Sequence, residues 1–252
     1  RSARSAARTV VCESNVRQLG VGFQMYAAEN RDFLPGTSVD HVGRNRRTGY
    51  NYCWLGTWGD DGRNKKLVPS SGRLFPYVGR QVEVYKCPED KADAGEIEGY
   101  DGGVYNKTLY SYTGPSLISG AKTELLKDTY WPENFPDNYR WNQDWQRYSV
   151  RSLPWVIVEE HESQHLAYVT DSAWSNVDTI SDRHKGKGTV GHLDGSVSVR
   201  KYQRRYKAII WEATGVVDCW KVLFALRDGR IFTAGRGGYL GFINDAEPDL
   251  TR

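Results

Sequence analysis

The chain has 252 residues, enough for one substantial hydrophobic core with decorations and at most two domains. Hydrophobic residues make up 39% and charged residues 26%, which argues against both wholesale disorder and a membrane-embedded body. The formal net charge of +3 is too small to indicate a nucleic-acid partner, which calls for a strong basic patch. No stretch approaches the roughly 18 to 20 apolar residues that span a bilayer, and no signal-peptide core precedes the first Arg.

The first thirty residues are predicted to form one amphipathic helix. Apolar residues recur at spacings of four and three, so they share one face that must pack against another part of the protein. These residues are Cys12, Val16, Leu19, Phe23 and Tyr26. The segment before them is rich in Ala, Ser and Arg, and we expect it to project beyond the core. Asn30 is a candidate cap and Pro35 prevents continuation, so the helix is predicted to end near residue 30.

The middle of the chain is predicted to consist of loops and short elements. We expect a long loop or short strand over residues 36–66, a short helix or turn over 67–78, a strand over 81–85, a loop over 86–90, an acidic loop over 91–103 and an aromatic-rich insertion over 120–150. The insertion contains three Trp residues but shows no clear period.

The second half of the chain is predicted to be rich in β-strands. Apolar and β-branched runs cover residues 155–158, 166–170, 189–193 and 197–199, and a helix is expected over residues 206–213 before further runs over 222–226 and 231–234. Two pairs of runs flank Asp194-Gly195 and Asp228-Gly229, and Asp-Gly between alternating runs is a strong hairpin signal. A helix first and antiparallel strands later predict an α+β fold.

Several motifs occur in the order found in one protein family. Residues 12–20 read C-E-S-N-V-R-Q-L-G, residues 87–90 read C-P-E-D, and Ser111-Tyr112 follows. Nine residues separate His184 from Asp194-Gly195. In these motifs the chain resembles the pseudopilin-like proteins of planctomycetes and their relatives, which are related to type IV pilins and type II secretion major pseudopilins. The resemblance covers roughly residues 1–200, and the insertion and the C-terminal segment have no counterpart in it.

The resemblance implies a pilin-like α+β fold, with a long N-terminal α-helix packed on an antiparallel β-sheet, loop insertions and a C-terminal extension. The expected organisation is a stalk helix over residues 1–33, a globular head over 34–204 with the insertion near 120–150, and an extension over 205–252. The family also carries a prepilin leader and a hydrophobic start to the helix. We therefore expect a further N-terminal segment, missing from this sequence, that is inserted in the inner membrane before assembly.

By the same resemblance, the expected function is structural and not enzymatic. The chain would be a subunit of a type IV pilus-like or type II secretion pseudopilus-like filament in the cell envelope, either periplasmic or extracellular. Its expected partners are copies of itself in a helical homopolymer and the pilus or secretion assembly machinery, with no nucleic acid. The expected filament-packing residues of the helix are Val16, Leu19, Phe23 and Tyr26, and the family motif is carried by His184, Asp194 and Gly195.

One enzymatic motif competes with this interpretation. Residues 161–165 read H-E-S-Q-H, and on a helix His161 and His165 would share one face for zinc, with Glu162 as general base. The alternative function is therefore a zinc-dependent hydrolase. However, the flanking runs resemble strands, which favours a hairpin loop at this position.

A third interpretation is a surface protein that binds glycans through exposed aromatic rings. The candidate side chains for stacking on sugars are Trp54, Trp58, Trp131, Trp141 and Trp145. Packing in satellite cores or in contacts between subunits is the commoner fate of such residues.

Two groups of polar residues are candidates for metal binding. Asp90, Asp93, Glu96 and Asp101, with Glu98 between them, form an oxygen-rich segment of the kind that calcium prefers, although the spacing fits no EF-hand. The resemblance also implies calcium in the heads of related pseudopilins. The second group contains Asp171, His184, His192 and Asp194, but no nucleophile motif accompanies it. We expect His184 to order its loop by hydrogen bonding and Asp194 to form a turn with Gly195.

The cysteines Cys12, Cys53, Cys87 and Cys219 form no C-x-x-C pair, which argues against a zinc knuckle or a thioredoxin-like site. Their even number suits two disulfides outside the cytosol, and all four are disulfide candidates. Because Cys12 lies on the apolar helical stripe and Cys87 follows a predicted strand, a Cys12–Cys87 bridge would lock the helix to the sheet. Buried free thiols are the alternative.

Overall fold

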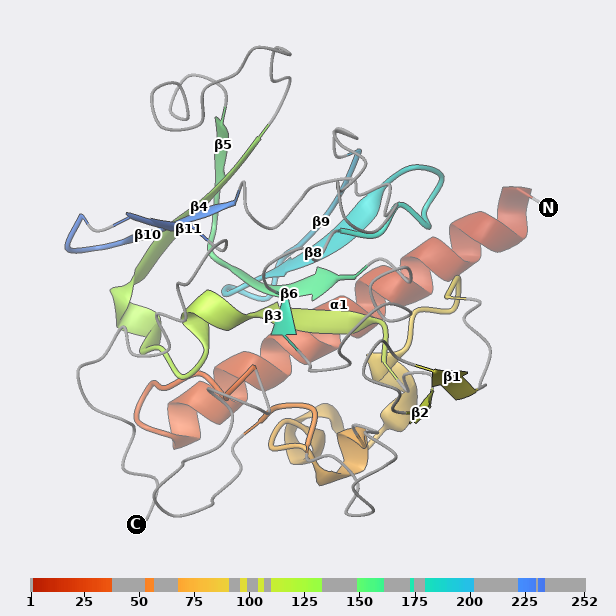
Figure 1. Ribbon diagram of the computed structural model, residues 1–252, viewed down its shortest axis with the longest axis horizontal. Helices are drawn as coiled ribbons and strands as arrows, with labels where there is room; N and C mark the ends of the chain where they lie inside the picture. Colours follow the sequence, from red (N-terminus) through yellow and green to blue (C-terminus); the bar gives the residue numbers. More distant parts are fainter. Residues whose placement is uncertain are drawn as a thin grey trace.

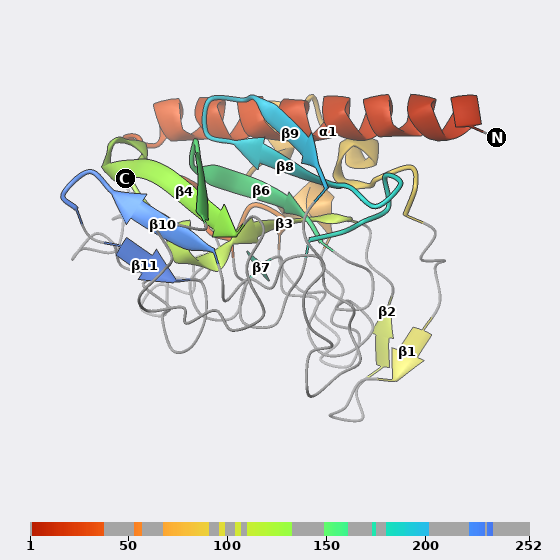
Figure 2. The same ribbon diagram turned by 90° about the horizontal axis from the view of Figure 1, so that it is seen from above.

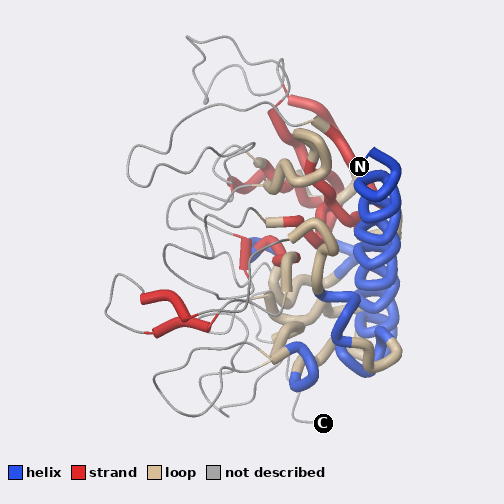
Figure 3. Tube along the Cα trace, turned by 90° about the vertical axis from the view of Figure 1, so that its right-hand side faces the viewer, coloured by secondary structure: helices blue, strands red, loops and turns tan. Residues whose placement is uncertain are grey.

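The computed structural model describes residues 2–37, 53–56, 68–90, 96–98, 104–106, 110–132, 149–160, 173–174, 180–201, 222–229 and 231–233. Within them, one long helix, α1 (Ser2–Glu29), lies across one face of a β-sheet (Figures 1 and 3). The fold is α+β, with an N-terminal helix and mainly antiparallel sheets, as predicted for a pilin-like fold. Among the residues with described structure, no helix combines the length and apolar character that a membrane span needs.

Helix α1 forms where the three-and-four spacing predicts it. The apolar stripe from Cys12 to Tyr26 is buried against the protein's own sheet and 3₁₀ segments. The residues expected to pack in a filament therefore pack within the chain, and they are Val16, Leu19, Phe23 and Tyr26. Asn30 caps the C-terminal end by donating a hydrogen bond from its side chain to the carbonyl of Tyr26 at 2.7 Å. Arg31 then takes a left-handed backbone conformation that ends the helix. The N-terminal end is exposed and extends past the strands in Figure 2, as predicted.

The sheet under α1 has five strands in the order β7-β3-β6-β8-β9. The strands are β3 (Tyr112–Pro115), β6 (Trp155–Glu159), β7 (Ala173–Trp174), β8 (Gly188–His192) and β9 (Val197–Arg200), and all pair antiparallel except β3 with β7. Every residue of β6 is buried, so this strand runs through the centre of the core. A Cβ atom on Gly191 would lie 2.8 Å from Val16 Cγ1, so α1 can approach β8 this closely only over a glycine.

Both predicted hairpins are confirmed. The β8–β9 hairpin turns at Gly195, which has a φ of 81°. The second hairpin joins β10 (Leu223–Leu226) and β11 (Ile231–Thr233) and turns at Gly229, which has a φ of 89°. In both turns glycine supplies the positive φ that other residues adopt only with strain.

A second sheet unites two segments that the resemblance did not cover. Its order is β11-β10-β4-β5, where β4 spans Leu126–Pro132 and β5 spans Ser149–Ser152 (Figure 1). Strand β10 of the expected C-terminal extension therefore pairs with β4 of the aromatic-rich insertion. The insertion predicted over residues 120–150 contributes a strand at each end, and these two strands pair with each other while β4 also pairs with the distant β10.

In the described part of the chain, short 3₁₀ helices connect the longer elements, three of them before β3 and two after it. These are η1 (Pro69–Ser71), η2 (Phe75–Val78), η3 (Val82–Tyr85), η4 (Ser116–Ile118) and η5 (Thr123–Leu125), and a small hairpin joins β1 (Glu96–Glu98) to β2 (Val104–Asn106). The strand predicted over residues 81–85 is wrong, because η3 occupies that position. Val84 and Tyr85 are both buried, so the apparent alternation of residues 82–85 does not separate two faces.

Aromatic rings fill the core below the C-terminal half of α1. The centroids of Phe23 and Trp54 are 5.4 Å apart, and those of Trp54 and Tyr85 are 5.9 Å apart. Elsewhere in the core, the ring centroid of Trp155 lies 6.4 Å from that of Trp131 and 6.0 Å from that of Trp174. Such tilted contacts are favourable for the ring quadrupoles and bury a large apolar area.

Candidate metal centre

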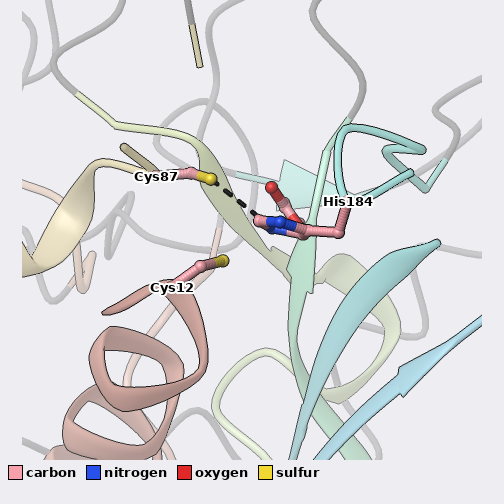
Figure 4. Close-up of side chains that lie close together, drawn as sticks. Cys12, Cys87 and His184 are labelled. Atoms are coloured by element: carbon pink, nitrogen blue, oxygen red, sulfur yellow. Dashed lines mark hydrogen bonds and ion pairs between the residues drawn. The ribbon is translucent and has the colours of Figure 1, made fainter. Parts of the chain in front are cut away.

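Four residues with metal-ligating side chains meet where the N-terminal half of α1 crosses the sheet. Each of Cys12, Cys87, Glu159 and His184 offers one ligand atom, and these atoms all lie within 4.8 Å of one another. Cys12 on α1, Cys87 and His184 point toward one another in Figure 4. The side chains are almost fully buried: the two cysteines and Glu159 are 0% exposed, and His184 is 3% exposed.

Local structure fixes the backbone of each of the four residues. Cys12 belongs to the buried face of α1, and Cys87 follows η3 and donates its backbone N–H to Ser111 Oγ at 3.0 Å. Glu159 is the last residue of β6 and pairs with Tyr112 of β3. His184 sits in the tight loop before β8, where its N–H and carbonyl both bond to Lys187. The ring of His184, which was expected to order its own loop, instead reaches into the cluster and contacts Thr9, Cys87 and Glu159.

The imidazole ring of His184 is held from both nitrogens. Its Nε2 lies 3.6 Å from Cys87 Sγ and 3.1 Å from Glu159 Oε2. Its Nδ1 lies 3.1 Å from the hydroxyl oxygen of Thr9. The Thr9 hydroxyl donates a hydrogen bond to the carbonyl of Ser5, at 3.1 Å, so its oxygen is available to accept a hydrogen bond from Nδ1–H of His184. When His184 is neutral, its proton is therefore on Nδ1 and Nε2 is directed at the cluster.

A buried set of charges surrounds Glu159. Arg183 reaches Glu159 Oε1 at 3.4 Å and also lies 3.8 Å from Asp90 Oδ2. Asp90 in turn pairs with Lys86 at 3.1 Å and accepts a hydrogen bond from Ser111 Oγ at 2.5 Å. Arg183 therefore compensates one carboxylate oxygen of Glu159 and leaves Oε2 facing the cysteines and the histidine.

The close contacts shift the pKa values of the cluster. Burial opposes the charged form of His184, but its close contacts with Cys87 and with the Glu159 carboxylate outweigh burial and raise the pKa of His184 to about 10. Burial also opposes the Glu159 carboxylate, yet His184 and the charge of Arg183 lower the pKa of Glu159. A hydrogen bond to Cys12, together with burial, raises the pKa of the Cys87 thiol far above its usual range. Without a metal, the pair His184–Glu159 is therefore ionised and the Cys87 thiol is neutral.

Cys12 completes the cluster from the helix side. The hydroxyl of Tyr112 donates a hydrogen bond to Cys12 Sγ at 3.2 Å, and the Cys12 thiol contacts Thr189 Oγ1 at 3.7 Å. The predicted Cys12–Cys87 bridge is not formed in this structure, in which both residues are buried free thiols. Cys53 is also a buried free thiol, and Cys219 lies outside the described residues.

The other histidine of the candidate metal group Asp171, His184, His192 and Asp194 lies in a different environment. His192 contacts the carbonyl of Leu153 at 3.1 Å and Ser198 Oγ at 2.7 Å, so it does not join His184 in one site. Asp194 Oδ1 accepts hydrogen bonds from the backbone N–H of Ser196 at 2.9 Å and from its hydroxyl at 2.6 Å. The turn role predicted for Asp194 is confirmed, and Asp171 lies outside the described residues.

Other candidates are only partly covered by the structure. The H-E-x-x-H residues 161–165 lie outside the described part of the chain, as do Asp93 and Asp101 of the calcium hypothesis. Asp90 is already engaged by Lys86, Arg183 and Ser111, and Glu96 lies in β1. The calcium site therefore stays a prediction.

The Trp residues proposed to stack on sugars are also only partly covered by the structure. Trp54 and Trp131 are 0% and 2% exposed, so these two rings belong to the core and cannot stack on a sugar. The other three, Trp58, Trp141 and Trp145, lie outside the described residues.

Glu159 is the residue of the cluster that the sequence reasoning missed. It ends the apolar run Trp-Val-Ile-Val, where a buried carboxylate needs a compensating partner. A single acid at the end of a fully apolar strand is the signal that would have found it. Arg183, next to the selected His184, is that partner.

Comparison with known proteins gives one match. Residues 1–82, about a third of the chain, match the model of a family described as a protein of unknown function (DUF1559). No curated protein and no solved structure matches the chain. The family match contains all of α1 and η1 to η2, and it is compatible with a pilin-like surface protein.

Proposed function

We propose that the chain is a structural subunit of a pilin-like filament of the cell envelope, and that it polymerises with copies of itself. The observation that carries this proposal is that α1 has apolar residues on both of its faces. One face is used inside the protein, and the other is exposed and available to a neighbouring subunit. The family match over residues 1–82, which contains the whole helix, supports the same conclusion.

The exposed face of α1 is unusually apolar for a surface helix. Val10, Val11, Val21 and Met25 are 63%, 49%, 42% and 48% exposed. They are four of the six large hydrophobic residues that the described part of the chain exposes. At about 100° per residue, Val10, Val21 and Met25 lie opposite the stripe that packs on the sheet. A helix of 28 residues is about 42 Å long, so this face offers an extended contact surface.

An open groove runs beside this face. It has a volume of about 380 Å³ and is lined on one side by α1, including Val21, and on the other by Tyr77 to Gly79 of η2 and its end. The groove is continuous with the exposed apolar face, since Val21 belongs to both. A neighbouring helix packed along α1 would cover the groove and the apolar face together.

The test is electron microscopy of the native protein purified from its cells. We expect regular filaments, and we expect Met25→Glu to abolish them because a carboxylate would be buried between subunits. Leu153→Glu is the matched control, because Leu153 is 47% exposed but lies off the helix, between β5 and β6. Circular dichroism would check that both variants remain folded.

Two outcomes would contradict the proposal. Native protein that forms only discrete particles would exclude a filament subunit. Equal loss of filaments in Met25→Glu and Leu153→Glu would show that the exposed face of α1 has no special part in assembly. Peptide hydrolysis that is lost on Glu162→Gln would instead establish the zinc hydrolase.

A further inference from the structure

We propose that Cys12, Cys87, Glu159 and His184 bind one zinc ion that fastens α1 to the sheet. The site joins the N-terminal helix to the loop after η3, to the end of β6 and to the loop before β8. This proposal does not depend on filament formation, because all four residues belong to the core of a single chain.

The distances between the ligand atoms fit a tetrahedral ion. With metal distances of about 2.3 Å to sulfur and about 2.1 Å to nitrogen and oxygen, adjacent ligands lie about 3.6 Å apart for sulfur and nitrogen, and about 3.4 Å apart for nitrogen and oxygen. Cys87 Sγ is 3.6 Å from His184 Nε2, and Glu159 Oε2 is 3.1 Å from the same nitrogen. All four atoms fall within 4.8 Å of one another. Only small side-chain shifts are needed to close this set around an ion.

The atoms around the ligands have the orientation that a metal site requires. His184 is fixed by its Nδ1 contact with Thr9, which leaves Nε2 as the ligand nitrogen. Arg183 holds Glu159 through Oε1, and the hydroxyl of Tyr112 donates to Cys12 Sγ, as it would to a thiolate. Three of the four ligands therefore have a polar partner that orients the side chain without blocking the ligand atom.

One buried oxygen in the cluster lacks a hydrogen bond. Glu159 Oε2 is fully enclosed, and no donor among the described residues is aligned to form a hydrogen bond with it, although His184 Nε2 lies 3.1 Å away. A buried carboxylate oxygen without a hydrogen bond is costly. A cation between Oε2, Nε2 and the two sulfurs would satisfy it.

Charge is balanced when the ion is bound. Two thiolates and one carboxylate carry three negative charges, and Zn²⁺ reduces the net charge of the site to −1, which Arg183 compensates. Binding converts both thiols to thiolates and leaves His184 neutral, so the thiol protons and the imidazolium proton pass to solvent. No oxidant or reductant is needed.

The donor set and its burial indicate a structural ion. Two sulfurs, one nitrogen and one oxygen suit zinc, and four protein ligands leave no position open for a substrate. A nucleophilic role for Cys87 does not fit, because the thiol is 0% exposed and because Glu159 and Cys87 share the same nitrogen of His184. The remaining rival is a Cys12–Cys87 disulfide.

The experiment combines metal analysis with cobalt substitution of the full chain. We expect the native protein to contain one equivalent of zinc by plasma mass spectrometry. After chelation, Co²⁺ should restore one equivalent and produce visible bands of tetrahedral cobalt together with thiolate-to-cobalt charge transfer in the near ultraviolet. Thiolate bands would distinguish this site from the H-E-x-x-H residues, which contain no sulfur.

Matched variants locate the ion. Cys87→Ser and His184→Gln should each reduce Co²⁺ affinity at least tenfold and weaken the bands. Cys53→Ser and His192→Gln should leave affinity and spectrum unchanged, because Cys53 and His192 are also buried but lie outside the cluster. Because cluster variants can fail to fold, the Co²⁺ titration of chelated wild-type protein is a separate test that needs no mutation.

Three results would overturn the proposal. The first is wild-type protein with free thiols that binds neither zinc nor cobalt stoichiometrically. The second is equal loss of metal in the cluster variants and in the two control variants. The third is a Cys12–Cys87 disulfide in native protein, found by peptide mass spectrometry without reduction, which would establish the bridge instead of the ion. Filament microscopy is unaffected by these results, so the two proposals fail separately.

Discussion

The two halves of α1 pack on very different surfaces. The N-terminal half covers ionised and sulfur-containing groups around His184, whereas the C-terminal half covers the stacked rings around Trp54. The side chains in both interfaces are buried, so burial alone does not distinguish the two. The difference teaches that one helix can be attached by contacts that depend on pH, metal and oxidation at one end, and by contacts that depend on none of these at the other.

The two buried histidines, His184 and His192, differ in a similar way, because their pKa values are shifted in opposite directions. Burial lowers the pKa of His192, whose neighbours are a backbone carbonyl and a hydroxyl. Burial acts in the same direction on His184, but Glu159 and Cys87 reverse it. A nearby carboxylate therefore decides whether a buried histidine is charged.

The largest expected loss of stability is in the aromatic half of the α1 interface, where the C-terminal half of the helix packs on the rings around Trp54. Trp54→Ala removes a fully buried ring that contacts Phe23 and Tyr85, and we expect it to lower the free energy of unfolding by about 3 to 5 kcal/mol. Urea unfolding would measure this, with and without a chelator. The loss should be the same in both conditions, and a loss that changed on chelation would show that the two halves are not independent.

A somewhat smaller loss of stability is expected in the ionised half of the α1 interface, where the N-terminal half of the helix covers Glu159 and His184. Glu159→Gln leaves Arg183 and His184 without their buried counter-charge, and we expect a loss of about 3 kcal/mol in chelated protein. The control is Glu124→Gln, which breaks an exposed ion pair with Lys122 and should cost less than about 0.5 kcal/mol. Similar losses in the two variants would contradict the assignment of a buried ion pair to Glu159.

The pH dependence of chelated protein should come from the ionised half. The pKa of His184 is raised from 6.5 to about 10, so its contribution to stability is complete below pH 6.5 and is lost as the pH rises through 10. The pKa of Glu159 is lowered, so its contribution is lost as the pH falls below about 4.5. Thermal unfolding from pH 6 to 10 would measure this loss, which should approach a slope of about 1.4 kcal/mol per pH unit between the two pKa values.

Variants of the two histidines would assign this loss. His184→Gln should flatten the stability profile between pH 6 and 10, and His192→Gln should retain the slope of the wild type. If His192→Gln removed the slope, the assignment of the alkaline loss to His184 would be wrong.

The smallest effect tests a polar contact in the aromatic half. Tyr77→Phe removes the hydrogen bond that the Tyr77 hydroxyl donates to Glu29 at 2.6 Å but keeps the ring that packs on Tyr26. Because this contact is exposed, we expect a loss below about 1 kcal/mol by urea unfolding. Tyr77→Ala should cost more, since it also removes the ring. A larger loss from Tyr77→Phe would show that polar contacts also hold this half.

Local signals in the sequence predicted much of the fold. The spacing of Val16, Leu19 and Phe23 predicted α1, and the two Asp-Gly pairs predicted the hairpins, because these patterns involve residues close in the chain. The error over residues 82–85 has a tertiary cause. Lys86 and Glu83 present their carbonyls to the side chain of Asn15 on α1, so this segment ends against the helix and not against a strand.

The candidate metal centre could not be assembled from the sequence. Cys12 and Cys87 were selected for a bridge. His184 was selected for loop order and as a member of a different candidate metal group, and the three were never considered as one site. Their proximity depends on the crossing of α1 over β6 and β8, which no local pattern encodes. The second sheet could not be predicted for the same reason, because β4 pairs with β10, a strand far along the chain.

The separation between Cys12 and His184 also has a consequence for folding during synthesis. The two residues are 172 positions apart, from 12 to 184, so the helix meets this part of its sheet only after most of the chain has been made. At about 5 to 20 residues per second, the ribosome needs roughly 10 to 30 s to make the intervening segment. During that time the apolar stripe of α1 has no native partner on β8, so the nascent chain should need protection by a chaperone for longer than a protein with mostly local contacts.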